Sequence, residues 1–102
     1  MARISVTPQA ENDLEKIQDD IVVRAGQAIA SRFIGRVMAA IRTVAVTPLA
    51  SGRNVPELGA GLRCHPFGNY NIYLVYDADT DTLHVARVLY GRRRITRRHF
   101  RK

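Results

Sequence analysis

Apolar residues recur at helical spacing in two stretches of the first half of the chain. The first stretch has apolar residues at intervals of four, three and four: Ala10, Leu14, Ile17 and Ile21. This spacing places them on one face of a helix. Thr7 and Pro8 are residues typical of a helix start, and Gly26 is typical of a helix end. We therefore predict an amphipathic helix between Pro8 and Gly26.

The second stretch predicts a longer helix that starts at about Gln27 and ends before Pro48. Its apolar face consists of Ala30, Phe33, Ile34, Val37, Ile41 and Val44. The connection at Gly26 is very short, so the two helices should form a helical hairpin. Because such helices are unstable alone, each needs an apolar surface to cover.

After a loop at residues 49–61, which is rich in Gly, Pro, Ser and Asn, the pattern becomes that of strands. Strands are expected at residues 62–67 (LRCHPF), 70–76 (YNIYLVY) and 83–90 (LHVARVLY). The turns between them are short, so neighbouring strands should be antiparallel. Residues 70–76 are apolar on both faces and should be central. Residues 2–6 (ARISV) predict a further strand at an edge or at the terminus.

Together these elements predict an α+β fold with two layers. An N-terminal strand precedes a helical hairpin, which packs on one face of a three- to four-stranded antiparallel sheet. The length of 102 residues suits a single domain over residues 1–102, of which residues 95–102 form a basic C-terminal extension. The stretch after Gly91 has no helix breaker and could add one short helix.

The basic charge of the chain is concentrated at its C-terminus. Residues 1–86 carry eight basic and nine acidic groups, a balance of −1, whereas residues 87–102 carry eight basic groups and no acid. The net charge of +7 therefore arises entirely from the last segment. Such asymmetry indicates a polyanionic or acidic protein partner, and the alternative is a solvated terminal fringe.

Cationic and aromatic residues also follow one another along the predicted strands. Arg63 lies on the first of the three strands, Tyr70, Tyr73 and Tyr76 on the second, and Arg87 on the last. Groups of this kind on neighbouring strands can stack on bases and neutralise phosphates. Alternatively, the tyrosines are packing residues and the arginines border the sheet.

The sequence predicts neither a metal site nor a cofactor. Cys64 is the only cysteine, and the three histidines are not at zinc-ligand spacing. Cys64 is expected to be a small buried residue rather than a nucleophile, because its neighbour His65 would point to the other face of the strand. A lone cysteine suits a reducing compartment. With no bilayer-length apolar run and no secretory signal, we expect a cytoplasmic protein.

Three segments of the chain resemble a known family. These are TPQAENDLEKIQDDI, GRNVPELGAGLRCHPFGNYNIYLVYD and LHVARVLYGRR, within a match that covers about residues 3–94. Their order and content resemble the RelE/ParE superfamily of toxins from bacterial type II toxin–antitoxin systems, and are closest to its ParE branch. The resemblance implies the small α+β fold of these toxins, which is also the fold that periodicity predicts.

The ParE resemblance implies a toxin that blocks DNA gyrase while the DNA is cleaved, without being an enzyme itself. It also implies a ParD-like antitoxin that folds its C-terminal segment around the toxin to form a hetero-oligomer. We expect target contacts from Arg63, Tyr70, Tyr76, Arg87, Arg92, Arg93, Arg94, Arg97 and Arg98. We expect antitoxin contacts from Leu14, Ile17, Phe33, Val37, Ile41 and Tyr73.

The RelE branch implies a different activity, ribosome-dependent cleavage of messenger RNA. Asn71 stands where the resemblance would require one catalytic arginine, although Arg93 could match the other and His99 could act as a base. Phe100, near the position of the RelE tyrosine, has no hydroxyl group. Gyrase inhibition is therefore favoured over an mRNA interferase. Arg94 stands where ParE proteins often have Asp, and a binding module with only an antitoxin partner is a third alternative.

Overall fold

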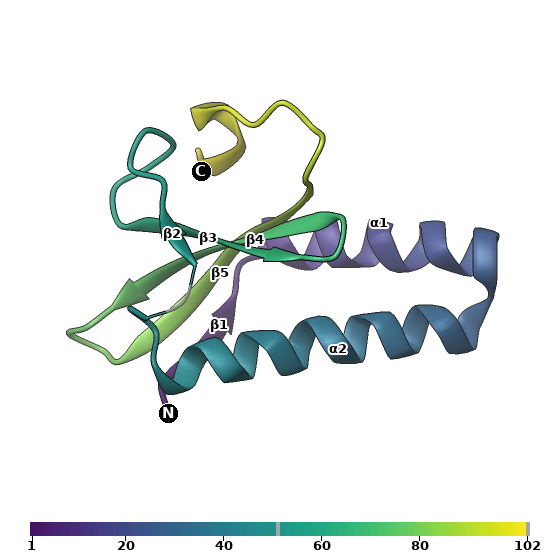
Figure 1. The fold of residues 1–102 in the computed structure, drawn as a ribbon, viewed down its shortest axis with the longest axis horizontal. Coiled ribbons are helices and arrows are strands. Elements are labelled where there is room, and N and C mark those ends of the chain that lie inside the picture. Colours follow the sequence, from purple (N-terminus) through teal and green to yellow (C-terminus); the bar gives the residue numbers. More distant parts are fainter. Residues whose placement is uncertain (51, 102) are drawn as a thin grey trace.

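The computed structural model describes residues 1–50 and 52–101, in which a helical hairpin forms one layer and a five-stranded sheet the other (Figure 1). The elements are β1 (Arg3–Val6), α1 (Pro8–Ala25), α2 (Gln27–Val46), β2 (Arg53–Asn54), β3 (Leu62–Phe67), β4 (Tyr70–Asp77), β5 (Thr82–Tyr90) and a short 3₁₀ helix, η1 (Arg97–Phe100). The predicted α+β class with two layers is confirmed.

The helices of the hairpin begin and end at the cap residues that the sequence predicted. The Thr7 side-chain oxygen accepts a hydrogen bond from the Ala10 N–H at 3.1 Å, and Pro8 is the first residue of α1. Gly26 has a φ of 93°, donates its N–H to the Val22 carbonyl, and separates α1 from α2. A residue with a side chain would be strained in this conformation, so glycine permits the tight reversal.

The sheet has the strand order β1-β5-β4-β3-β2, so β4 is the central strand as predicted. It is mixed rather than purely antiparallel, because β1 runs parallel to β5 with Arg3 opposite Thr82 and Val6 opposite Val85. A parallel neighbour requires a long crossover connection, and much of the chain lies between β1 and β5. The two-residue strand β2 arises within the predicted loop and adds the fifth strand.

The main core lies between the helices and one face of the sheet. The predicted apolar faces of both helices point into it, with Ile17 from α1 and Val37 and Ile41 from α2 among its buried residues. They pack against apolar residues of the central strands, including Ile72 and Val85. None of the helices in residues 1–50 and 52–101 is both long enough and apolar enough to cross a bilayer.

A second apolar cluster covers the opposite face of the sheet, for which the sequence predicted no covering element. It consists of the buried residues Val55, Leu62, Cys64, Tyr73 and Leu89. Leu58 from the β2–β3 loop and Ile95 and Phe100 from the C-terminal segment pack against it. Figure 1 shows both segments on the side of the sheet away from the hairpin. This arrangement explains why β4 is apolar on both faces.

Candidate functional site

An ion pair joins the middle of β5 to α1. The Arg87 guanidinium donates from Nε to Asp13 Oδ2 at 2.7 Å and from Nη2 to Asp13 Oδ1 at 2.8 Å. The Arg87 side chain is 18% exposed and that of Asp13 is 10% exposed. These hydrogen bonds, which the Asp13 carboxylate accepts, raise the pKa of Arg87 above its ordinary value. Arg87 was expected to contact a target. Since its charge is already paired with Asp13, Arg87 mainly joins β5 to α1.

This ion pair forms where β5 loses its neighbouring strand. β1 pairs only with Thr82–Val85, and beyond that point the start of α1 takes its place. The Thr7 hydroxyl donates to the Ala86 carbonyl at 2.8 Å, and Asp13 Oδ2 accepts the Val88 N–H at 3.0 Å. The helix thus supplies partners that a strand would otherwise provide, as buried backbone groups require.

The C-terminal segment is docked on the second cluster. The Phe100 ring meets the Tyr73 ring edge to face, with centroids 5.0 Å apart. Arg97 donates from Nε to the Glu57 carbonyl at 2.9 Å, and Arg87 donates from Nη1 to the His99 carbonyl at 2.8 Å. The basic extension is therefore held in place at several points along its length.

The His99 ring is held by the residue that starts η1. His99 Nδ1 lies 3.1 Å from the Thr96 backbone nitrogen and 3.2 Å from the Thr96 carbonyl oxygen, so the Thr96 backbone engages this ring nitrogen in either tautomer. Nε2 is the ring nitrogen that has no hydrogen-bond partner among the described residues.

A shallow hollow lies beside this docked segment, and we call it the basic hollow. It is lined by Arg87, Arg93, Arg94, Thr96, Arg98 and His99. No carboxylate is among the described residues that line it. Arg93, Arg94 and Arg98 are exposed, and Arg92 and Arg97 are exposed nearby in the chain. The structure thus gathers the C-terminal arginines expected to contact a target.

The other residues expected to contact a target lie elsewhere. Tyr70 and Tyr76 pack towards the helices, whereas Tyr73 belongs to the opposite face of β4. Arg63 on β3 hydrogen-bonds to residues at and before β2, and Tyr76 donates its hydroxyl to an aspartate of the β4–β5 turn. The predicted cationic and aromatic residues of the strands therefore do not form one continuous surface.

The residues expected to contact an antitoxin are largely part of the two cores. Ile17, Val37, Ile41 and Tyr73 are at most 6% exposed, and Leu14 and Phe33 are partly buried. In this structure the first four hold the fold together and offer almost no surface to a partner. The periodicity that identified them reports burial, and burial within the chain satisfies it. Large exposed apolar residues are instead found at Val23, Ile29, Val46, Leu49 and Tyr90.

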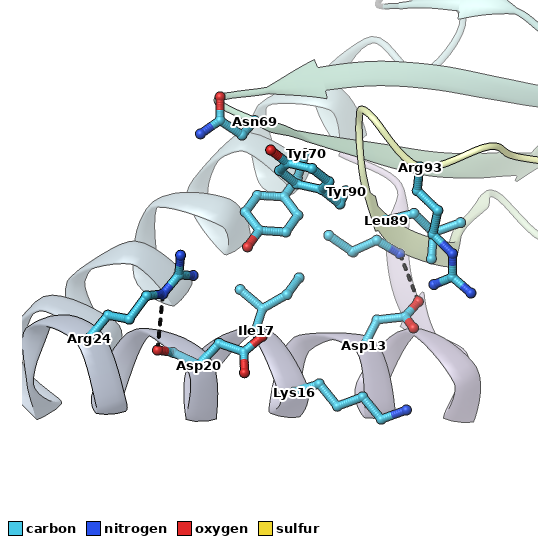
Figure 2. Close-up of a pocket in the computed structure, with 11 residues that line it drawn as sticks. Asp13, Lys16, Ile17, Asp20, Arg24, Asn69, Tyr70, Leu89, Tyr90 and Arg93 are labelled. Atoms are coloured by element: carbon cyan, nitrogen blue, oxygen red, sulfur yellow. Dashed lines mark hydrogen bonds between the residues drawn. The ribbon is translucent and has the colours of Figure 1, made fainter.

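A second hollow, of about 370 Å³, lies between α1 and the end of β5, and we call it the α1 hollow. Figure 2 shows the rings of Tyr70 and Tyr90 above α1, near Ile17. The two tyrosine rings are themselves in edge-to-face contact, 5.8 Å apart. Charged residues of both signs also line the hollow: Asp13, Lys16, Asp20, Arg24 and Arg93. The lining is therefore mainly polar, with Ile17 and the two tyrosine rings among its apolar parts.

Cys64 is buried, as predicted, and burial raises the pKa of its thiol. Both properties disfavour the thiolate that a nucleophile would need. Among residues 1–50 and 52–101, no three histidine, cysteine or acidic side chains are grouped so that they could hold a metal ion.

Asp13 is the residue at this site that sequence reasoning missed. In the sequence it is one of several acids near the start of a helix, where it complements the helix dipole. Its partner Arg87 is 74 positions away. No local pattern in a single sequence could have paired these two residues.

Comparisons with known proteins agree with this fold. The family described as "ParE toxin of type II toxin-antitoxin system, parDE" matches residues 4–95. No curated protein sequence matches the chain. The chromosomal ParDE system from P. aeruginosa is similar in structure, with a TM-score of 0.74 and 19% identity over 88% of this chain and 96% of that one. The RelBE2 toxin–antitoxin complex from Mycobacterium tuberculosis has a TM-score of 0.63 and 21% identity over 87% and 96%. The match of the family over nearly the whole chain shows that this protein belongs to the ParE toxins of type II toxin–antitoxin systems.

Proposed function

We propose that this protein inhibits bacterial growth by poisoning DNA gyrase in the cytoplasm and that a ParD-like antitoxin neutralises it. Membership of the ParE family supports this proposal. The observation that favours gyrase over messenger RNA is the packing of Phe100 on Tyr73, because Phe100 has no hydroxyl group and lies near the position where the RelE resemblance would require a tyrosine.

Metal-free cleavage of RNA needs a base for the 2′-hydroxyl, an acid for the leaving oxygen and cations for the charged transition state. His99 could supply one of these groups through Nε2, because its Nδ1 is engaged by the Thr96 backbone. Asn71 on β4 is neutral, and Phe100 packs on Tyr73 and has no hydroxyl to donate. The cations are present, but neither Asn71 nor Phe100 supplies a second group that could move a proton.

Gyrase poisoning can be tested directly with the purified toxin. We expect folded toxin to trap gyrase on a supercoiled plasmid with its DNA cleaved, so that protease and detergent treatment releases linear DNA. Unchanged supercoiling and no linear product at saturating toxin would overturn the proposal. Arg32→Gln, an exposed change on α2, is the control variant and should retain full activity.

We further propose that an amphipathic, acidic segment of the antitoxin binds in the α1 hollow. The rings of Tyr70 and Tyr90 offer it apolar contacts. Lys16, Arg24 and Arg93 offer three cations beside the carboxylates of Asp13 and Asp20, of which Asp13 is already paired with Arg87. Of the residues first expected to contact the antitoxin, Ile17 lines this hollow and the others would act through the fold.

The antitoxin proposal is tested with the product of the adjacent open reading frame. Tyr90→Ala should weaken the complex at least tenfold, because the Tyr90 side chain is 42% exposed and contacts Tyr70. Val23→Ala, at an exposed apolar position on α1, is the control. Raised salt should slow association. An association rate that does not depend on salt contradicts the electrostatic part of the proposal.

The RNA-cleaving alternative remains a second candidate because Arg93 and His99 line the same basic hollow. Primer extension on translated messages would then show cuts in phase with codons, and these cuts would disappear in Arg93→Ala and His99→Ala. Expression without antitoxin distinguishes both toxic activities from the third alternative. A chain that serves only as a binding module would not arrest growth.

A further inference from the structure

We propose that the basic hollow binds the phosphodiester backbone of nucleic acid directly, without a partner protein. This goes beyond gyrase poisoning, which does not require the toxin itself to touch DNA. The hollow is defined by the six residues Arg87, Arg93, Arg94, Thr96, Arg98 and His99.

The distribution of charge supports a polyanionic ligand. Residues 1–86 have a balance of −1, whereas residues 87–102 carry eight basic groups and no acid. Arg93, Arg94 and Arg98 are exposed in the hollow, and no carboxylate is among its described lining residues. The local field at this surface is therefore positive although most of the chain is nearly neutral, which concentrates anions there.

The docking of the segment distinguishes this surface from a solvated fringe. Phe100 is anchored on Tyr73, Arg97 is anchored on the Glu57 carbonyl, and the His99 carbonyl accepts from Arg87. These contacts hold the backbone that carries the cations. A ligand then pays less conformational entropy on binding than it would with a disordered tail.

The donors of the hollow suit phosphate oxygens. The exposed forks of Arg93, Arg94 and Arg98 can each donate two parallel hydrogen bonds to one phosphate. All six lining residues are polar or charged, so the apolar surface of the hollow comes from the hydrocarbon parts of these side chains and not from apolar residues. An amphipathic peptide would find no apolar residue here as a partner for its own, whereas a nucleic-acid backbone needs none. The hollow therefore favours nucleic acid over an acidic protein segment.

The test is fluorescence anisotropy with the purified full-length toxin and labelled duplex DNA, single-stranded DNA and RNA of equal length. Three exposed arginines that each neutralise one phosphate predict a slope of about −3 for log affinity against log salt on duplex DNA. Arg93→Gln, Arg94→Gln and Arg98→Gln together should reduce affinity at least tenfold and remove most of this slope. The three arms identify the preferred nucleic acid.

A matched control triple carries the same loss of charge at exposed positions outside the hollow: Arg3→Gln, Arg32→Gln and Arg42→Gln. We expect its affinity to stay within about twofold of the parent, because these residues do not line the hollow. An equal loss in both triples would overturn the proposal, since binding would then depend only on total charge. Thermal unfolding confirms that each variant is folded.

Two further measurements keep the proposal open to refutation. Changing the three arginines to lysines retains the charge, so the salt slope should persist while affinity falls with the loss of the bidentate forks. Poly-glutamate of equal charge should bind at least tenfold more weakly than DNA, and equal binding would overturn the assignment to nucleic acid. A toxin that poisons gyrase but binds none of the three nucleic acids would refute this inference and leave the proposed function intact.

Discussion

Removal of the Asp13 carboxylate should destabilise the whole fold, because this group joins α1 to β5 and orients Arg87, which in turn binds the C-terminal segment. In Asp13→Ala, the guanidinium of Arg87 loses two hydrogen bonds of 2.7 and 2.8 Å, and the Val88 N–H loses its acceptor. Arg87 keeps only its bond to the His99 carbonyl. A partly buried cation and a backbone donor are therefore left with fewer partners.

The magnitude follows from the partial burial of the pair. Breaking a fully buried ion pair by removing one partner costs about 3–5 kcal/mol, and an unsatisfied buried donor costs about 1–3 kcal/mol. The Arg87 side chain is 18% exposed and can gain water after the change, so we expect a total below the sum of these costs, about 3 kcal/mol. For a domain of this size that corresponds to a fall in Tm of about 12–24 °C.

The assay is chemical denaturation followed by far-ultraviolet circular dichroism, applied to a double-mutant cycle. Asp13→Ala, Arg87→Met and the double variant should give a coupling free energy of about 2 kcal/mol, because the double variant leaves neither charge unpaired. Asp19→Ala, at an exposed position on the same helix, should change stability by less than about 0.5 kcal/mol. A coupling free energy below about 0.5 kcal/mol would refute the reasoning that this pair joins the elements.

Three further changes test the second core and the backbone. Phe100→Ala should lower the free energy of unfolding by about 2 kcal/mol and free the C-terminal segment for proteolysis, because its ring packs on Tyr73; an unchanged cleavage pattern would contradict this. Gly52→Ala should lower the free energy of unfolding by about 2 kcal/mol or more, because φ is +74° and a Cβ would collide with the Cys64 carbonyl. Gly35→Ala, in open space on α2, should instead raise the free energy of unfolding by about 0.5–1 kcal/mol. Equal effects of the two changes in chemical denaturation would refute this reasoning. Burial raises the pKa of the Cys64 thiol, so the stability that the buried, protonated thiol contributes should be lost as pH rises above 9.0, and Cys64→Ala should weaken this loss of stability at alkaline pH. The Cys64 thiol should also react with alkylating agents far more slowly than the thiol of the unfolded chain. A thiol that reacts at the unfolded rate would contradict its burial.

The predicted helices and the three main strands agree with the structure because each depends on local information. Thr7 and Gly26 bound α1 through contacts with residues three or four positions away. Period-2 and period-3.6 patterns identify which side chains are buried wherever the chain eventually places them. For this reason the prediction that Val37 and Ile41 lie on the apolar face of α2 is confirmed, although the chain itself covers this face and leaves these residues almost no surface for an antitoxin.

The candidate site could be predicted only in part. The concentration of basic residues after β5 is visible in the sequence, and the structure groups Arg93, Arg94 and Arg98 in one hollow. The sequence does not show that Tyr70 and Tyr76 face the helices whereas Tyr73 faces the second cluster, because a strand that is apolar on both faces does not reveal what covers each face. The docking of Phe100 on Tyr73 supplies that cover.

By itself, the sequence determined the identity and order of the main elements, their apolar faces and the basic character of the C-terminal segment. Only the tertiary structure decided that β1 is parallel to β5, that Asp13 meets Arg87 across 74 positions, and that Phe100 holds the basic segment on the sheet. The physical reason is that periodicity and capping act within a few residues. The pairing of distant groups depends instead on which packing arrangement satisfies the burial and hydrogen bonding of the whole chain.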